Sequence, residues 1–298
     1  MNASKLLTVG LVQHACSASR NKNLERSQSG IRQAAADGAR LVLLQELHTA
    51  VYFCQTEDPR AFAMAETVPG PTTGLLGKLA KELAIVIIGS VFEKCAAGFF
   101  YNTAVVLNPD GKLAGSYRKT HIPDDPGYSE KFYFTPGNRG IKAIDTPVGR
   151  LGVLVCWDQW YPEAARLMAL DGAQLLLYPS ALGWDAGDRA DQRDQQLEAW
   201  ITVQRGHAIA NQLPVLCCNR TGTELAADDS GADIEFWGSS FACGPQGEML
   251  ARAGNADQVL LADVDLSRNA ELDRVWPFFR DRRTDLYGDL VKRHRKRS

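Results

Sequence analysis

The chain has 298 residues, of which 45% are hydrophobic and 23% charged, and its formal net charge is −2. This is ordinary globular composition, and the balanced charge argues against bulk attraction to nucleic acid or to a membrane surface. No apolar run is long enough to span a bilayer. The 7 cysteines include no CxxC pair, and residues 1–7 lack signal-peptide architecture. These features predict reduced thiols and a cytoplasmic protein.

Apolar runs alternate with helical patterns along the first half of the chain. In chain order, the pattern predicts a strand over residues 6–12, a helix over 23–36, a strand over 41–45, a helix over 73–83, and strands over 85–92, 103–107 and 112–118. The last two strands are joined by Asn108-Pro109-Asp110-Gly111, a strong turn signal.

The second half repeats this order. It predicts a strand over residues 151–155, a helix over 162–170, a strand over 175–178, a long helix over 191–211, and strands over 215–219, 239–243, 248–252 and 259–264. Because no linker-like stretch separates the halves, we expect one domain over residues 1–298, an α/β fold with two mixed sheets packed face to face and helices outside. The basic residues near the end form a C-terminal arm, about 285–298, that is solvated or docks a subunit.

Cys156 occupies an informative position in this pattern. The apolar run before it predicts a buried strand, and Pro162 and Glu163 suit the first turn of the helix that follows. The thiol is therefore expected on a tight turn between strand and helix, where a nucleophile faces a cleft and its thiolate is stabilised. A buried core cysteine is the alternative interpretation.

Glu46 and Lys119 also directly follow predicted strands. Strand ends of this kind gather at one edge of an α/β sheet, where ligands usually bind. Taken singly, Glu46 suits a helix cap or an ion pair, and Lys119 suits a solvated strand end. Three reactive side-chain types at three such ends together predict an active site.

The segments around these residues resemble the nitrilase superfamily, which are carbon–nitrogen hydrolases with a Glu-Lys-Cys triad. The resemblance rests on Leu43-Leu44-Gln45-Glu46, Tyr117-Arg118-Lys119-Thr120-His121-Ile122-Pro123, Gly152-Val153-Leu154-Val155-Cys156-Trp157-Asp158 and the segment 128–134 that contains Glu130. It implies a four-layer αββα sandwich, with Glu46, Lys119 and Cys156 as the triad and Glu130 as the second glutamate. It also implies self-association, as dimers or multiples of them, with residues 160–170 and the arm as contacts.

The chemistry fits these residue types. Glu46 would take the thiol proton, Lys119 and the backbone N–H of Trp157 would stabilise the oxyanion, and Glu130 would orient Lys119 or the substrate. No metal or other cofactor is expected, and no HxH, HExxH or CxxC pattern offers a metal site. A Cys-His mechanism with His121 as base is a second possibility, since an imidazole suits that task.

Longer segments, 121–134, 156–166 and 276–283, resemble one family within the superfamily, the N-carbamoylputrescine amidases. That resemblance implies hydrolysis of N-carbamoylputrescine to putrescine, carbon dioxide and ammonia in polyamine synthesis. Such a small cationic carbamoyl substrate needs a carboxylate and aromatic faces. The candidates for these groups, and for a pocket-lining backbone, are Asp125, Tyr52, Trp157, Trp184 and Ser180.

Two alternatives stay open at this stage. One is hydrolysis of another carbamoyl or amide substrate, such as N-carbamoyl-β-alanine or an ω-amide; an anionic substrate of this kind would favour an arginine fork for its carboxylate. The other is a binding or scaffold protein that keeps the fold without turnover.

Overall fold

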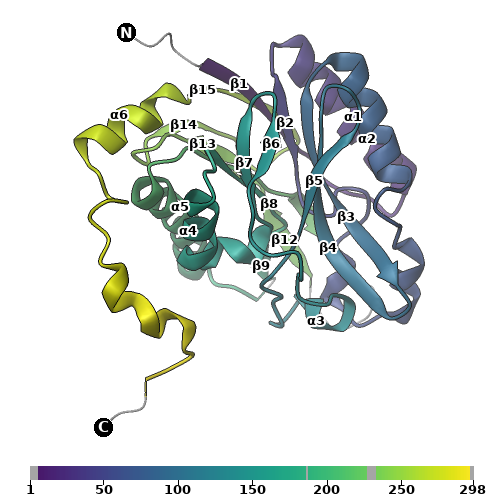
Figure 1. The fold of residues 1–298 in the computed structure, drawn as a ribbon. Coiled ribbons are helices and arrows are strands. Elements are labelled where there is room, and N and C mark those ends of the chain that lie inside the picture. Colours follow the sequence, from purple (N-terminus) through teal and green to yellow (C-terminus); the bar gives the residue numbers. More distant parts are fainter. Residues whose placement is uncertain (1–5, 186, 227–232, 296–298) are drawn as a thin grey trace.

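The computed structural model describes residues 6–185, 187–226 and 233–295. Two six-stranded mixed sheets lie between two layers of helices, as Figure 1 shows. This is the αββα sandwich that the repeated order of elements predicted. Residues 1–5 and the last residues of the predicted arm, 296–298, lie outside the described part of the chain.

The first sheet has the strand order β15-β1-β2-β3-β4-β5. Its strands are β1 (Leu6–Gln13), β2 (Leu41–Leu44), β3 (Val86–Ala96), β4 (Phe99–Leu107), β5 (Leu113–Arg118) and β15 (Gln258–Asp265). β1, β2 and β3 are parallel, while β4 is antiparallel to both β3 and β5. β5 therefore runs in the direction of β2 and ends at the same edge. The outer face of this first sheet packs against α1 (Arg20–Ala36) and α2 (Pro71–Leu83).

The second sheet has the order β14-β13-β10-β8-β7-β6. Its strands are β6 (Ile144–Thr146), β7 (Gly149–Val153), β8 (Leu175–Pro179), β10 (Val215–Cys218), β13 (Phe241–Cys243) and β14 (Met249–Arg252). β7, β8 and β10 are parallel. α4 (Pro162–Leu170) and α5 (Ala190–Asn211) cover its outer face, on the side of the molecule away from α1 and α2 (Figure 1).

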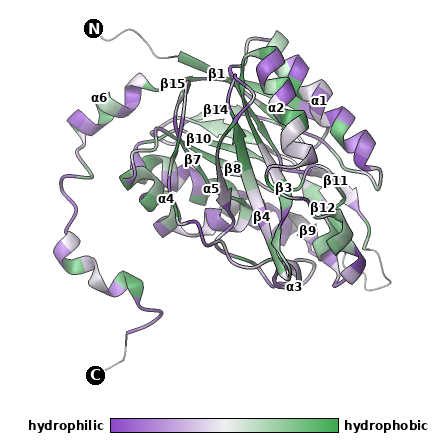
Figure 2. Cartoon of the chain, turned by 45° about the vertical axis from the view of Figure 1, so that its right-hand side comes forward, coloured by the Kyte–Doolittle hydropathy of each residue, from purple (hydrophilic) through white to green (hydrophobic). Residues whose placement is uncertain are grey.

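Alternation along β2 shows how the sequence builds these layers. Leu41 and Leu43 pack against the second sheet, while Val42 and Leu44 pack under the helices. All four side chains are buried because both faces of the strand are covered. Hydropathy follows the layers, with apolar strands inside and mixed helices outside (Figure 2).

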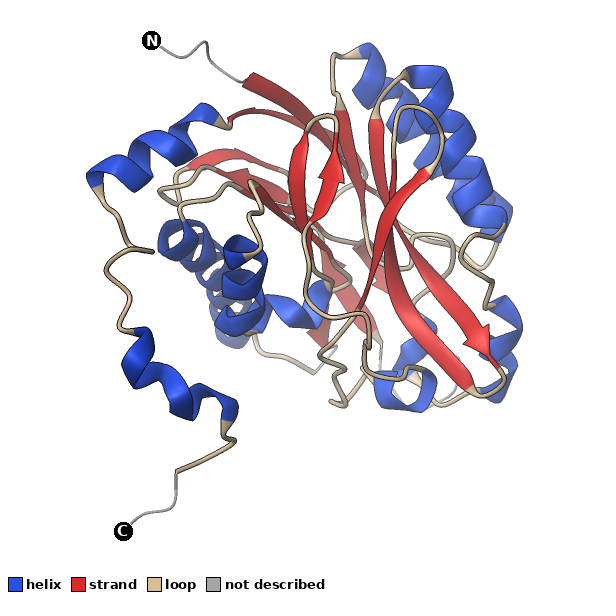
Figure 3. Cartoon of the chain, viewed as in Figure 1, coloured by secondary structure: helices blue, strands red, loops and turns tan. Residues whose placement is uncertain are grey.

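Several short elements were not predicted. A third sheet joins β11 (Thr221–Glu224), β12 (Ile234–Trp237) and β9 (Gly183–Asp185). The others are α3 (Glu130–Tyr133), α6 (Ser267–Val275) and the 3₁₀ segments η1 (Phe53–Gln55), η2 (Pro59–Met64), η3 (Cys156–Trp160) and η4 (Thr284–Val291), all drawn as helices in Figure 3. The strands and the shortest helical segments carry too few residues to show a period in the sequence. α6 is as long as α4 but buries no residue, so it lacks the apolar face that marks a helix.

Candidate active site

The two sheets bring three strand ends together. Glu46 follows β2 and Lys119 follows β5 in the first sheet, and Cys156 follows β7 in the second. Lys119 Nζ lies 2.9 Å from Glu46 Oε1. The expectation that these residues meet at one edge of the fold is therefore correct for Glu46 and Lys119. Cys156 is close enough for both charges to act on the pKa of its thiol.

Lys119 is shared between two carboxylates. Its ammonium donates to Glu46 and also to Glu130, at 2.8 Å from Oε1 and 2.7 Å from Oε2. All three side chains are fully buried. Burial alone would lower the pKa of Lys119, but the charges of Glu130 and Glu46 outweigh it and hold that pKa well above its usual value. Lys119 is thus a fixed positive charge.

Burial has the opposite consequence for Glu130. It raises the pKa of this carboxyl to about 7, although Lys119 and a hydrogen bond from Tyr52 act to lower it. Tyr52 is buried, and its hydroxyl donates to Glu130 Oε1 at 2.7 Å. Tyr52, predicted to face the substrate, therefore also holds the second glutamate in place.

Glu46 has one engaged and one available oxygen. Oε1 accepts hydrogen bonds from Asn102 Nδ2 at 2.6 Å and from Lys119. Oε2 is buried and has no hydrogen-bond partner among the described residues. The main-chain N–H of Glu46 donates to the carbonyl of Ser180 at 3.3 Å. A carboxylate oxygen in this situation can accept a proton from a nearby group.

Cys156 lies on a sharp turn, as predicted. β7 ends at Val153, two residues earlier than expected, and η3 begins at Cys156, whose φ is +42°. A positive φ is strained for a residue with a side chain, and such strain is common at functional sites. Burial raises the pKa of the Cys156 thiol well above its usual value, and Glu46 adds to this effect. The raised pKa favours a neutral thiol that needs a base, which is consistent with the predicted transfer of its proton to Glu46.

The turn is held by Asp158, a residue to which the sequence assigned no role. Its Oδ2 accepts from the N–H of Val155 at 3.0 Å and from the hydroxyl of Tyr117 at 2.9 Å. Its Oδ1 accepts from the N–H of His121 at 3.0 Å and lies 2.7 Å from His121 Nδ1. One buried carboxylate thus ties the nucleophile turn to the end of β5.

These contacts argue against the Cys-His alternative. The ring of His121 faces Asp158 and stacks on Tyr161, with ring centroids 3.7 Å apart and planes 6° apart. The imidazole is engaged with the support of the turn. Glu46 is the side chain with an available basic oxygen beside Lys119.

The remaining predicted substrate residues have different surroundings. Trp157 is half-buried directly after Cys156, whereas Asp125 lies on an exposed turn closed by a hydrogen bond from the N–H of Tyr128 to the Asp125 carbonyl. The indole N–H of Trp184 donates to the carbonyl of Arg193 at 3.0 Å. The Ser180 hydroxyl faces Gln159 and Cys217, so only the Ser180 backbone points toward Glu46.

Sequence reasoning missed Asn102 and Arg220. Arg220 is fully buried, and its guanidinium donates to the carbonyls of Glu46 and Leu47 at 3.1 Å and 2.9 Å. A signal was available for it, because Arg220 directly follows the predicted strand 215–219. The strand-end argument that selected Glu46 applies equally to this residue.

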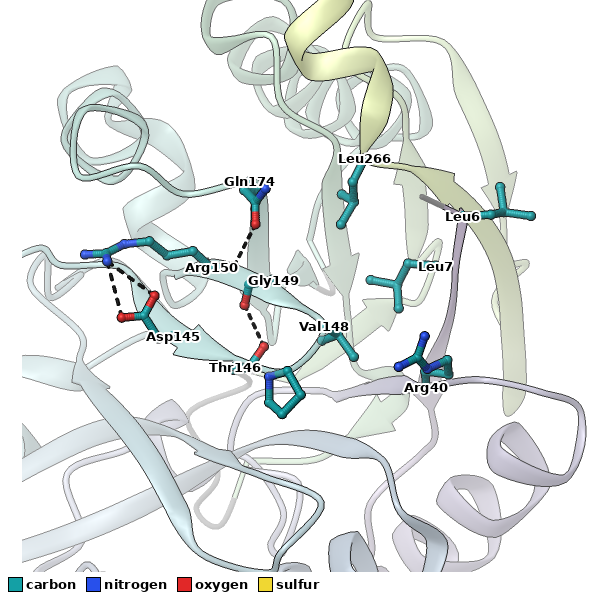
Figure 4. Close-up of a pocket in the computed structure, with 11 residues that line it drawn as sticks. Leu6, Leu7, Arg40, Asp145, Thr146, Val148, Gly149, Arg150, Gln174 and Leu266 are labelled. Atoms are coloured by element: carbon teal, nitrogen blue, oxygen red, sulfur yellow. Dashed lines mark hydrogen bonds and ion pairs between the residues drawn. The ribbon is translucent and has the colours of Figure 1, made fainter. Parts of the chain in front are cut away.

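A cavity lies at the ends of these strands opposite to the triad (Figure 4). It has a volume of about 350 Å³ and includes Leu6, Arg40 and Gly149, at or before the starts of β1, β2 and β7. Its Arg150 is paired with Asp145 and Asp171. The cavity contains no cysteine and is separate from the triad.

Among residues 6–185, 187–226 and 233–295, no group of His, Cys, Asp or Glu side chains is arranged to hold a metal ion. Within those same ranges, none of the helices has both the length and the apolar character needed to cross a bilayer.

Comparisons with known proteins agree with this arrangement. Residues 8–274 match the carbon-nitrogen hydrolase family. The N-carbamoylputrescine amidase of Solanum lycopersicum is 43% identical over 97% of this chain and 96% of its own length. The citrullinase of Francisella tularensis is 40% identical over 97% of this chain and 99% of its own length. The crystal structure of a carbon-nitrogen hydrolase from Helicobacter pylori G27 has a TM-score of 0.94 and 49% identity, covering 97% of this chain and 100% of that one.

Both the match over most of the chain and the identity to curated relatives identify an enzyme, which sets aside the scaffold alternative. The chain belongs to the carbon-nitrogen hydrolase family, within the nitrilase superfamily, and is an amidase-type enzyme.

Proposed function

We propose that the enzyme hydrolyses N-carbamoylputrescine to putrescine, carbon dioxide and ammonia, a step of polyamine synthesis, with Cys156 as nucleophile. The observation that carries this proposal is the buried ammonium of Lys119, which is held between Glu46 and Glu130 beside the thiol. A fixed cation, a free carboxylate oxygen and a nucleophile in one water-poor site are what attack on a urea carbonyl requires.

The first half-reaction begins with proton transfer from the neutral thiol of Cys156 to Glu46. The sulfur then attacks the carbamoyl carbon, and the carbonyl oxygen becomes an oxyanion. Lys119 contacts one oxygen of Glu46 and both oxygens of Glu130, and when a single N–H is shared by the two Glu130 oxygens, its third N–H is left for this oxyanion. The N–H of Trp157 is the second donor. The first nitrogen then leaves with the proton from Glu46, and an S-carbamoyl enzyme remains.

The second half-reaction uses the same groups in reverse order. Glu46 takes a proton from water, and the resulting hydroxide attacks the thioester-type carbonyl. Collapse of the tetrahedral intermediate returns the proton to Cys156 and releases a carbamic acid. The carbamic acid splits into carbon dioxide and the second amine, so that one water is consumed for each substrate.

The charge of three segments, 57–60, 124–131 and 184–193, supports a cationic substrate. Two of them contain the predicted substrate residues Asp125 and Trp184. The Lys and Arg side chains of the segments are each paired with a carboxylate, and these are Arg60, Lys131, Arg189 and Arg193. Several acids in the same segments form no ion pair with a described residue, and these are Glu57, Asp125, Asp185 and Asp188. The surplus is negative, which favours an ammonium over a carboxylate on the substrate.

Citrulline is the second candidate, because the similarity to a citrullinase is almost as high. Citrulline presents the same neutral urea end, so the chemistry at Cys156 is unchanged. Its other end carries an α-carboxylate beside an α-ammonium, and the carboxylate is best bound by an unpaired arginine fork. Arg189 and Arg193 are both paired with carboxylates, which disfavours citrulline.

A comparison of three carbamoyl substrates tests the assignment. Ammonia release should show a kcat/KM for N-carbamoylputrescine about 100-fold above those for citrulline and N-carbamoyl-β-alanine, the difference expected from a few kcal/mol of charge recognition. Asp125→Asn should lower kcat/KM for the cationic substrate alone. Asp124→Asn is its matched control, because Asp124 is already paired with Lys131. Preference for citrulline would move the assignment to that substrate.

A further inference from the structure

The loop between β10 and β11 inserts a buried cation behind the site. Arg220 Nη2 donates to the carbonyls of Glu46 at 3.1 Å and Leu47 at 2.9 Å, and Nη1 donates to the carbonyl of Ala50 at 2.9 Å. The N–H of Arg220 donates to the Ser180 carbonyl at 3.2 Å, which also accepts from the N–H of Glu46. Arg220 therefore holds the Glu46 carbonyl directly and shares with the Glu46 N–H the carbonyl of Ser180.

Glu224 extends this contact to the second glutamate. Its Oε1 accepts from Arg220 Nη1 at 2.7 Å, and its Oε2 accepts from the N–H of Tyr52. Tyr52 in turn donates through its hydroxyl to Glu130 at 2.7 Å. Arg220 and Glu224 thus contact both ends of the segment 46–52. Arg220 contacts Glu46 at one end, and Glu224 contacts Tyr52 at the other, where the Tyr52 hydroxyl positions Glu130.

This segment needs external support. It belongs to no strand or helix, and Leu47 has φ +48°, which is strained for a leucine. Three of its carbonyls point at one guanidinium, whose planar fork can serve several acceptors at once. An ammonium has a different donor geometry and cannot reproduce those contacts.

We propose that Arg220 and Glu224 are positioning residues that set the distance from Glu46 to Cys156 and, through Tyr52, the orientation of Glu130. The inference rests on the proposed roles of Glu46 and Cys156. It predicts that the pair controls the reactivity of the thiol in addition to stabilising the fold.

Glu224→Gln tests the pair, and Glu93→Gln is the matched control. Glu93 is the carboxylate of the other buried Glu–Arg pair, with Arg118, and it contacts β4 and β5 and makes no contact with segment 46–52. In both variants, the N–H₂ group of the new glutamine faces an arginine N–H, so that two donors meet where an ion pair stood. The measurement is the rate of Cys156 alkylation by iodoacetamide as a function of pH, followed by mass spectrometry of the Cys156 peptide, together with the melting temperature.

We expect Glu224→Gln to slow alkylation of Cys156 by about 10- to 100-fold and to shift its pH profile, with kcat falling equally and KM within about threefold. Glu93→Gln should lower the melting temperature comparably but leave alkylation within about threefold of the wild type. Arg220→Lys keeps the positive charge but loses the planar guanidinium, and it should behave like Glu224→Gln. It replaces Glu224→Gln in the experiment if that variant does not fold.

Equal alkylation rates and pH profiles in a folded position-224 or position-220 variant and in Glu93→Gln would overturn the proposal. Alkylation needs no substrate, so this result is distinguishable from failure of the proposed function. A wild-type enzyme that is readily alkylated but releases no ammonia from any carbamoyl substrate would contradict the function and leave the positioning pair standing.

Discussion

A single buried ammonium decides much of the behaviour of this site at the scale of residues. Lys119 pairs with two carboxylates, Glu46 and Glu130, and its charge offsets part of the cost of burying theirs. Removing it would leave uncompensated buried charge, at a cost of about 3–5 kcal/mol, so a Lys119 variant confuses loss of folding with loss of catalysis. Substitutions of its neighbours that leave the buried charges in place are more informative.

Tyr52→Phe is such a change. It removes a hydrogen bond that lowers the pKa of Glu130, so that pKa should rise above its present value of about 7. More enzyme then carries a neutral Glu130 at neutral pH, and the acidic limb of the kcat profile should move to higher pH. We expect kcat near pH 7 to fall about 5- to 100-fold, the cost of losing one buried hydrogen bond to a charged group. A profile of kcat between about pH 5 and about pH 9 checks this, and an unmoved acidic limb would contradict it.

At the scale of elements, the nucleophile turn depends on Asp158. An asparagine there accepts at one atom only, whereas Asp158 accepts from Val155, Tyr117 and His121. Asp158→Asn should therefore lower the free energy of unfolding by about 2 kcal/mol. Because the lost contacts also hold the nucleophile turn, we expect kcat to fall at least tenfold. Asp171→Asn, at a half-exposed pair with Arg150, is the control and should leave kcat unchanged. Urea unfolding and steady-state kinetics separate the two outcomes.

The elements also show how far sequence reasoning reached. Helix 162–170 has the predicted bounds, and β2 was found because both of its faces are apolar, whereas β5 was found through the turn signal at residues 108–111. Strand 151–155 was predicted two residues too far along the chain, because β7 spans Gly149–Val153 and the N–H of Val155 is used by Asp158 instead of the sheet. β9, β11 and β12 were missed because they are short and pair only with one another.

The same limit applies to the site. Glu46, Lys119 and Cys156 were accessible because each follows a strand, a local signal that survives without a structure. Trp184 was chosen for its aromatic ring, but its N–H is satisfied by Arg193. The contacts of Arg220 and Asp158 join segments far apart in the chain, and no spacing in one sequence reveals such contacts.

A buried histidine pair links three elements and predicts a pH dependence of stability. Ser27 Oγ on α1 lies 3.0 Å from both His14 Nε2 and His48 Nδ1. Burial lowers the pKa of His14 to about 4 and that of His48 to about 3. Both are neutral in the folded and unfolded states above about pH 6.5, so their stabilisation is complete there and is lost as the pH falls toward about 3. Glu130, with its raised pKa, acts in the opposite direction between about pH 7 and about pH 4.5.

Urea unfolding of the wild type at several pH values between about 6.5 and about 4.5 should show the free energy of unfolding decreasing as the pH decreases, by up to about 1.4 kcal/mol per unit for each histidine less the opposite contribution of Glu130. His48→Gln should flatten this dependence, and the exposed His294→Gln should not. Identical slopes in the His48 variant and the wild type would contradict the assignment.

At the scale of the whole molecule, apolar side chains remain exposed on α4, α5 and the C-terminal arm. They include Leu167, Leu170, Ile209, Leu286, Leu290 and Val291, the last with 91% exposure. The arm runs outside the layers in Figure 1, and the segment 276–279 that leads to it touches the body through a hydrogen bond from Gln212 to the Trp276 carbonyl and the stacking of Arg166 over Phe279.

Apolar surface of this extent marks an interface, so we expect a homo-oligomer that uses α4 and the arm. Light scattering after size exclusion should give a mass of at least twice 32.6 kDa. Leu286→Asp with Leu290→Asp should lower that mass, while Leu6→Asp, an exposed leucine on β1, should not. A monomer at all concentrations would contradict the expectation.

Ammonia release from N-carbamoylputrescine by the wild type and by Cys156→Ser tests the central claim most directly. The account predicts steady release by the wild type and a loss on the order of a thousandfold or more in the variant, because a serine hydroxyl is a far weaker nucleophile beside the same base. Comparable release by both proteins, or none by a folded wild type, would contradict it.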